Sequence, residues 1–258
     1  MPILDVRSRI PRVGALLAAV RGCLGIRPWR AGARQDEGGS GVSDLGSLRA
    51  VLFDWDGTLV DSAEVSFRCY VRVFEAFGIG FDRRLFEQTY SPNWHHTYVA
   101  VGLPRERWEQ ADALWREAYA GHQTQLVAGA SAALERLGDA GLLQGIVTSG
   151  ERERVSQELR ALGVSSFFQA LVFGPDAKNR KPHPEALFLC LERLGVAPAQ
   201  AAYVGDSPED VQMARAAGVY SVGIPGGFPN RKALLASAPD LVATDLATAA
   251  TALLKPSA

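Results

Sequence analysis

Lysine and cysteine are scarce in this chain, and long apolar stretches are missing. Only four of the 27 basic residues are lysines, so a lysine within a motif stands out. The three cysteines are widely spaced and odd in number, which excludes a disulfide framework or a zinc site and indicates the reduced thiols of a cytoplasmic protein. No apolar run approaches the ~20 residues that a bilayer span needs, so we expect no membrane span. The net charge of −1 gives no electrostatic basis for binding nucleic acid.

Residues 1–48 differ in composition from the rest of the chain. They are rich in arginine and contain a Gly-Gly-Ser-Gly tract at residues 38–41, which is typical of a flexible linker. The apolar stretch at residues 14–20 is followed by arginines instead of the small residues of a cleavage site. We therefore expect a basic, flexible N-terminal extension, and a targeting or membrane-surface segment is the alternative.

From residue 49 onward, short apolar runs alternate with segments of helical period. This alternation is typical of a parallel sheet covered by helices, so we expect a doubly wound, Rossmann-like α/β core over residues 49–61 and 128–258. The predicted strands lie near residues 50–54, 144–148, 169–173, 201–205 and 219–223. The predicted helices between them cover residues 131–140, 151–162, 184–194 and 208–217.

Residues 62–127 break this alternation. They contain helical segments with many aromatic and charged residues, and no convincing strand. Because the segment leaves the core near residue 61 and rejoins it near Gly129, we expect an inserted α-helical cap over the carboxyl ends of the strands.

Two aspartates, Asp54 and Asp56, follow the apolar run at residues 50–53 within the sequence Asp-Trp-Asp-Gly-Thr. Residues two apart on a strand point to the same face, so both carboxylates can converge on one ligand, while Gly57 permits a sharp exit. An aspartate-rich turn is the plainer alternative, but a turn requires no buried strand before it. The pair suits a cation, a phosphoryl group or both.

Three further polar signals lie at or between the ends of later strands. Thr148 ends one predicted strand, Asp206 ends another, and Lys181 lies between them in the sequence. Ligands bind at the carboxyl ends of the strands in open α/β sheets, so we expect these residues to gather there. Each also has a simple structural explanation. Thr148 can cap a helix, Lys181 can be a solvated loop residue, and Asp210 can complete a capping box with Ser207.

The order of these motifs resembles that of the haloacid dehalogenase superfamily. The matching residues are Asp54 to Leu59, Thr148, Lys181-Pro182, and Gly205-Asp206 with Asp210. The match runs from residue 49 to about residue 245, and the insert after the first motif is similar to the subgroup of phosphoglycolate phosphatases and β-phosphoglucomutases. The resemblance implies a magnesium-dependent phosphatase that acts on a small phosphorylated metabolite, with phosphoglycolate or a sugar phosphate as the expected class.

The resemblance also implies a role for each matching residue. Asp54 would attack phosphorus to form an aspartyl phosphate, with positive charge supplied by Lys181 and Mg²⁺. The metal would be held by Asp54, the main-chain carbonyl of Asp56, and Asp206, while Asp210 would orient Lys181 or a metal-bound water.

In the same scheme, the side chain of Asp56 protonates the leaving alcohol and later activates water. Thr148 would donate a hydrogen bond to a phosphoryl oxygen. Asp56 disfavours the dehalogenase and phosphonatase branches, because both lack this second aspartate, and phosphonatases use a cap lysine that residues 62–127 do not contain.

Two alternatives stay open. β-Phosphoglucomutases keep both aspartates, but their usual histidine falls on Ser66 here, so transfer to a sugar is the first alternative to hydrolysis. A catalytically silent binding protein is the second, and the intact acidic and lysine positions count against it. Specificity is expected to come from the cap, where the residues to inspect, without an assigned role, are Arg68, Tyr90, Asn93, Trp94, His95 and His96.

Overall fold

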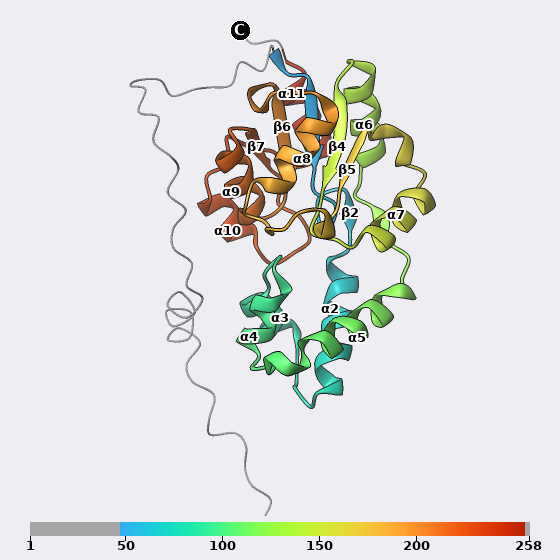
Figure 1. Cartoon of the computed structure of the whole chain (residues 1–258), viewed down its shortest axis with the longest axis vertical. Coiled ribbons are helices and arrows are strands. Elements are labelled where there is room, and N and C mark those ends of the chain that lie inside the picture. Colours follow the sequence, from blue (N-terminus) through green and yellow to red (C-terminus); the bar gives the residue numbers. More distant parts are fainter. Residues whose placement is uncertain (1–46, 256–258) are drawn as a thin grey trace, which may run out of the picture. The chain divides into compact units, whose positions relative to one another are not determined.

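Six parallel strands form the central sheet of the computed structural model, which describes residues 47–255 (Figure 1). Their order in the sheet is β5-β4-β1-β6-β7-β8. Their bounds are β1 (Ala50–Phe53), β4 (Leu143–Val147), β5 (Ala170–Val172), β6 (Ala201–Gly205), β7 (Tyr220–Gly223) and β8 (Leu241–Val242). The five predicted strands are confirmed. The edge strand β8 was not predicted, because two paired residues leave no apolar run to detect.

Helices cover both faces of this sheet, as expected for a doubly wound fold. The core helices are α6 (Ala130–Asp139), α7 (Arg152–Ala161), α8 (Glu185–Leu194), α9 (Pro208–Ala217), α10 (Arg231–Ala236) and α11 (Leu246–Leu253). Short 3-10 turns are η4 (Ser165–Phe167), η5 (Gly174–Asp176) and η6 (Pro198–Gln200). Val51 and Phe53 of β1 pack with α6, α7 and α11, whereas Ala50 and Leu52 pack with α8 and α9. The alternating side chains of one buried strand therefore hold both layers.

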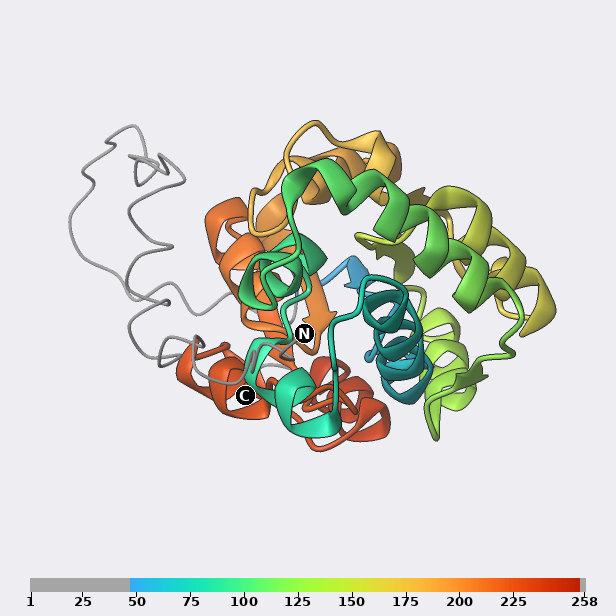
Figure 2. The same ribbon diagram turned by 90° about the horizontal axis from the view of Figure 1, so that it is seen from below.

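The remaining helices, which we call the cap, are α2 (Ala63–Ala76), α3 (Arg83–Thr89), α4 (Trp94–Ala100), η3 (Arg105–Arg107) and α5 (Trp108–Ala120). They lie together beyond one end of the sheet (Figure 1), and from below they surround the ends of the strands (Figure 2). Aromatic rings fill the interior of the cap: Phe74, Phe81, Phe86 and Tyr98 are all buried. The sequence indicated helical segments over residues 67–77, 83–90 and 105–119, which correspond to α2, α3 and η3 with α5, and it did not indicate α4.

The expectation that residues 62–127 contain no strand was wrong at one point. Residues 125–126 form β3 (Gln125–Leu126), which pairs antiparallel with β2 (Val60–Asp61). The ribbon is two residues long, too short for a recognisable alternation of side chains. It joins the two connections between cap and core, because β2 precedes α2 and β3 follows α5.

The sheet order places a topological switch point beside β1. The chain goes from β1 to β4 and β5 on one side, and then returns to β6 on the other side. The carboxyl ends of β1 and β6 thus flank the crevice where open α/β sheets bind ligands, and the cap stands over it. Within the described residues, none of the helices has the length and apolar character needed to cross a bilayer.

Candidate active site

Three predicted site residues follow directly after neighbouring strands. The amide of Asp54 donates to the carbonyl of Val204 at 2.9 Å, so the ladder between β1 and β6 continues into the site. The amide of Thr148 donates in the same way to Val172 at 3.0 Å. Asp54, Thr148 and Asp206 are all buried at this edge of the sheet. Parallel pairing therefore gathers residues that lie far apart in the sequence.

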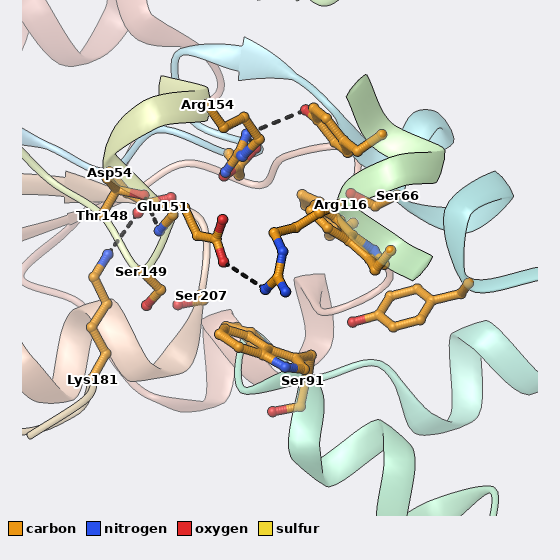
Figure 3. A pocket seen from close by; sticks show the side chains of 18 of the residues that line it. Asp54, Ser66, Ser91, Arg116, Thr148, Ser149, Glu151, Arg154, Lys181 and Ser207 are labelled. Atoms are coloured by element: carbon orange, nitrogen blue, oxygen red, sulfur yellow. Dashed lines mark hydrogen bonds and ion pairs between the residues drawn. The ribbon is translucent and has the colours of Figure 1, made fainter. Parts of the chain in front are cut away.

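Lys181 comes from the loop between β5 and α8 and points into the same crevice (Figure 3). Its Nζ lies 2.6 Å from Asp54 Oδ1, 2.8 Å from Asp210 Oδ1 and 2.7 Å from the hydroxyl of Tyr203. Burial by itself would lower the pKa of Lys181, but the carboxylates of Asp210 and Asp54 outweigh it and raise the pKa above its ordinary value. Lys181 is therefore a fixed cation and not a solvated loop lysine.

Asp54, Asp206 and Asp210 form a buried cluster in which one carboxylate oxygen of each lies within 4.8 Å of the others. Burial raises the pKa of Asp54 to about 7, although Lys181 acts in the opposite direction. Burial, followed by repulsion from Asp54, raises the pKa of Asp206 well above its ordinary value. The positive charge of Lys181 is therefore not enough to keep the pKa values of Asp54 and Asp206 in their ordinary range.

Asp206 offers a buried oxygen that suits a cation. Its Oδ2 is buried and has no hydrogen-bond partner in the part of the chain that the structure describes. A Cβ atom at Gly57 would lie 2.4 Å from this oxygen, so only glycine leaves room for the carboxylate. Gly57 also has a φ of 84°, a conformation that favours glycine. Buried carboxylate oxygens around such a point fit a divalent cation that prefers oxygen ligands.

Asp210 makes two kinds of contact, one as the capping-box partner of Ser207 and one with Lys181. Its Oδ2 accepts from the amide and the hydroxyl of Ser207, at 3.1 and 2.6 Å, and its own amide donates to Ser207 Oγ at 3.2 Å. This capping box begins α9. The other carboxylate oxygen accepts from Lys181. The helix start therefore positions the acid that holds the lysine.

Thr148 has a local structural contact as well. Its Oγ1 accepts from the amide of Gly150 at 3.0 Å, in the loop before α7, and the side chain lines the cavity beside Asp54. The hydroxyl hydrogen of Thr148 stays free to donate to a ligand.

Asp56 lies in the same cavity, but its carboxylate faces a residue that no sequence motif marks. Arg154 of α7 contacts both oxygens of Asp56, at 2.5 and 3.1 Å. The guanidinium also donates to Glu158 at 3.1 Å and to the hydroxyl of Tyr119 in the cap at 3.3 Å. In the sequence Arg154 is indistinguishable from its neighbours Arg152 and Arg160. Tyr203 was missed for a similar reason, since it reads as an ordinary buried strand residue.

A cavity of about 400 Å³ extends from the acidic cluster to the cap. Arg116 of α5 and Glu151 of the core point toward one another across it, at 3.2 Å (Figure 3). Among the cap residues marked for inspection, Tyr90 and Trp94 line this cavity. Arg68 instead pairs with Glu64 at an exposed position.

Comparisons with known proteins agree with the motif order. The family model of haloacid dehalogenase-like hydrolases matches residues 51–224. Phosphoglycolate phosphatase from Escherichia coli O157:H7 is 33% identical over 230 residues, which cover 78% of this chain and 90% of that protein. The enzyme of the same name from Salmonella typhimurium is 34% identical with the same coverage.

A similar fold occurs among solved structures. A haloacid dehalogenase-like family hydrolase from Streptococcus pneumoniae superimposes with a TM-score of 0.71 at 24% identity, covering 80% of this chain and 98% of that one. This likeness concerns the fold, whereas the family match at residues 51–224 spans the motifs themselves. The chain is a member of the haloacid dehalogenase-like hydrolase family.

Proposed function

We propose that this protein is a magnesium-dependent phosphatase that hydrolyses a small phosphomonoester through an aspartyl phosphate on Asp54. The observation that carries the proposal is the contact of 2.6 Å between Lys181 Nζ and Asp54 Oδ1, beside the unpartnered oxygen of Asp206. A carboxylate and a phosphate dianion repel each other, so attack requires positive charge at this point. The relatives named phosphoglycolate phosphatase support the same chemistry.

Mg²⁺ would be held by Asp54, Asp206 and the main-chain carbonyl of Asp56, while Asp210 would orient Lys181 or a metal-bound water. The orphaned Asp206 Oδ2 and the distances within the acidic cluster support this assignment. When bound, the metal supplies positive charge that offsets the charge of the phosphoryl oxygens.

The first step forms one bond and breaks another. A carboxylate oxygen of Asp54 attacks phosphorus, the ester P–O bond breaks, and the departing alcohol oxygen takes a proton from Asp56. Lys181 and the hydroxyl of Thr148 would donate to the phosphoryl oxygens during this transfer.

In the second step, water attacks the phosphorus of the aspartyl phosphate. Asp56 takes a proton from that water, the bond between phosphorus and Asp54 breaks, and inorganic phosphate leaves. Both aspartates then return to their starting states. The cap would exclude bulk water while the intermediate exists.

The test is phosphate release from a panel of phosphorylated metabolites by the full chain, with Mg²⁺ and with EDTA. We expect metal-dependent release that is lost in Asp54→Asn. Absence of release across the panel, or full activity of Asp54→Asn, would contradict the proposal. An isomerisation that depends on a sugar bisphosphate would instead identify a β-phosphoglucomutase-like transferase, and no turnover of either kind would favour a binding protein.

A further inference from the structure

The cavity is larger than its phosphate end requires. Asp54, Lys181 and Thr148 line one end, while the remainder of the ~400 Å³ extends under the cap. Pockets of ~300 Å³ or more ordinarily enclose ligands of drug size. This volume therefore has room for a leaving group bulkier than a two-carbon acid.

Aromatic side chains form the walls of that extra volume. They include Tyr90, Trp94, Tyr98, Trp115, Tyr119 and Phe228. Tyr90 stacks on Phe228 with centroids 4.6 Å apart, and Trp115 stacks on Tyr119 at 4.7 Å. Tyr90, Trp94 and Trp115 pack against the interior of the cap but are only half-buried, so part of each ring is exposed. Flat faces at the edge of a cavity suit a flat ring in the ligand.

The polar groups in this part of the cavity point to hydrogen-bond donors on that ligand. Asp112 lines the cavity, and its Oδ1 accepts from Trp94 Nε1 and from the hydroxyl of Tyr98, each at 2.9 Å. The other oxygen, Oδ2, lies 3.9 Å from His95 Nε2, which is beyond hydrogen-bond distance. A carboxylate has about four acceptor sites, so Asp112 can still accept from a further donor.

The cavity is poorly suited to bind a leaving group that carries a carboxylate. Among residues 47–255, the arginines that line the cavity already face carboxylates. Arg116 pairs with Glu151, and Arg154 pairs with Asp56 and Glu158. A second anion beyond the phosphate would instead meet Asp112, which repels it.

We infer that the substrate is a phosphomonoester whose leaving group is an aromatic or heteroaromatic ring with a hydroxyl or amine donor, and without a carboxylate. The ring lies against the aromatic wall, the donor binds Asp112, and the phosphate reaches Asp54. This inference rests on the proposed phosphatase activity and narrows its substrate class.

The test compares kcat/KM of the wild-type chain for three phosphate esters of primary alcohols. These are pyridoxamine 5′-phosphate, which has a ring with donors; benzyl phosphate, which has a plain ring; and phosphoglycolate. We expect that order, with about tenfold or more between the first and the last, since ~1.4 kcal/mol of differential binding gives a factor of ten. An equal or higher value for phosphoglycolate would overturn the inference.

Acetyl phosphate keeps this result separate from the proposed function. It has no ring, and its leaving group needs no protonation, so its magnesium-dependent hydrolysis tests the core chemistry alone. Turnover of acetyl phosphate with a preference for phosphoglycolate refutes the ring-bearing substrate and leaves the phosphatase standing. Failure to hydrolyse acetyl phosphate refutes the phosphatase itself.

Two variants test whether Trp115 and Asp112 contact the leaving group. Trp115→Ala should raise KM for benzyl phosphate by about tenfold. The matched control is Leu114→Ala on the same helix, since Leu114 packs within the cap and does not line the cavity. Asp112→Asn should lower the ratio of kcat/KM for pyridoxamine 5′-phosphate to that for benzyl phosphate, because the negative charge that attracts the donor is lost. Asparagine keeps an acceptor for Trp94 and Tyr98, so their contacts can persist. Unchanged values in both wall variants would contradict the assignment.

Discussion

Arg154 donates hydrogen bonds to the carboxylate of Asp56 from both terminal nitrogens of its guanidinium, at 2.5 and 3.1 Å. The same guanidinium reaches Glu158, which in turn accepts from the indole nitrogen of Trp55 at 2.7 Å. Trp55 is fully buried beside Asp56 in the sequence. The proposed acid and base is thus held by a chain of contacts from the hydrophobic core, and the hydroxyl of Tyr119 extends this chain to the cap.

Arg154→Met should reduce kcat with little change in KM, because Arg154 contacts carboxylates and not the phosphate end of the cavity. We expect a loss of about 10- to 100-fold, the effect of a misplaced catalytic group. Thermal unfolding should show destabilisation of about 3 kcal/mol, since partly buried carboxylates lose their cation.

Arg154→Lys is the control for charge without the planar fork. Lysine restores the positive charge but not two parallel contacts, so stability should recover more than kcat. If Arg154→Met keeps the kcat of the wild type, Asp56 does not depend on Arg154 for its orientation.

Asp56→Asn should trap the reaction after the first step. Asparagine cannot take the proton of the attacking water, so kcat should fall by about 10²- to 10⁴-fold. With radiolabelled acetyl phosphate, label should accumulate covalently on the protein. Asp54→Asn should carry none, and equal labelling of the two variants would argue against Asp54 as the nucleophile.

Magnesium should stabilise the protein more at high pH than at low pH. Burial raises the folded-state pKa of Asp54 to about 7, from an ordinary value of 3.8, and raises that of Asp206 as well. Without metal, the folded state binds more protons than the unfolded state between these values. The contribution of these carboxyls to folding stability is therefore complete below their ordinary pKa of 3.8, and it is lost as the pH rises through their folded-state pKa. Metal ligands must be deprotonated, so the gain from Mg²⁺ grows over the same window.

The measurement is the unfolding temperature with MgCl₂ and with EDTA, at about pH 5 and about pH 8. Asp206→Asn should show a smaller gain from Mg²⁺ and a flatter pH dependence in EDTA. A gain that is equal at both pH values would count against a metal site at these carboxylates.

Tyr203→Phe should destabilise the core next to the site. The hydroxyl of Tyr203 donates to the carbonyl of Val147 at 2.7 Å and accepts from Lys181 at 2.7 Å. Its removal leaves a buried carbonyl and a buried cation each short of a partner, at a cost of about 1–3 kcal/mol in urea unfolding. Tyr220→Phe is the matched control at a half-buried strand position. An equal decrease in the free energy of unfolding there would contradict a specific stabilising role of the Tyr203 hydroxyl.

The sequence by itself indicated five of the six strands of the sheet, the place of the helical insert and the motif residues. Apolar runs such as Ala50–Phe53 mark strands buried on both faces, and this local pattern needs no tertiary information. Asp54, Lys181 and Asp206 could be placed together because parallel strands end at one edge. The order of the motifs along the chain then indicated the family.

Only the tertiary structure decided which side chains meet across that edge. Arg154 and Asp56 are 98 residues apart, and Lys181 and Tyr203 are 22 apart, so no local periodicity links them. The cap likewise resembled any amphipathic helical segment until packing turned Trp115 and Asp112 toward the phosphate site. Spacing along the chain fixes which face of a strand or helix a residue occupies. Contacts between elements depend on how those faces pack, and packing is a property of the whole fold.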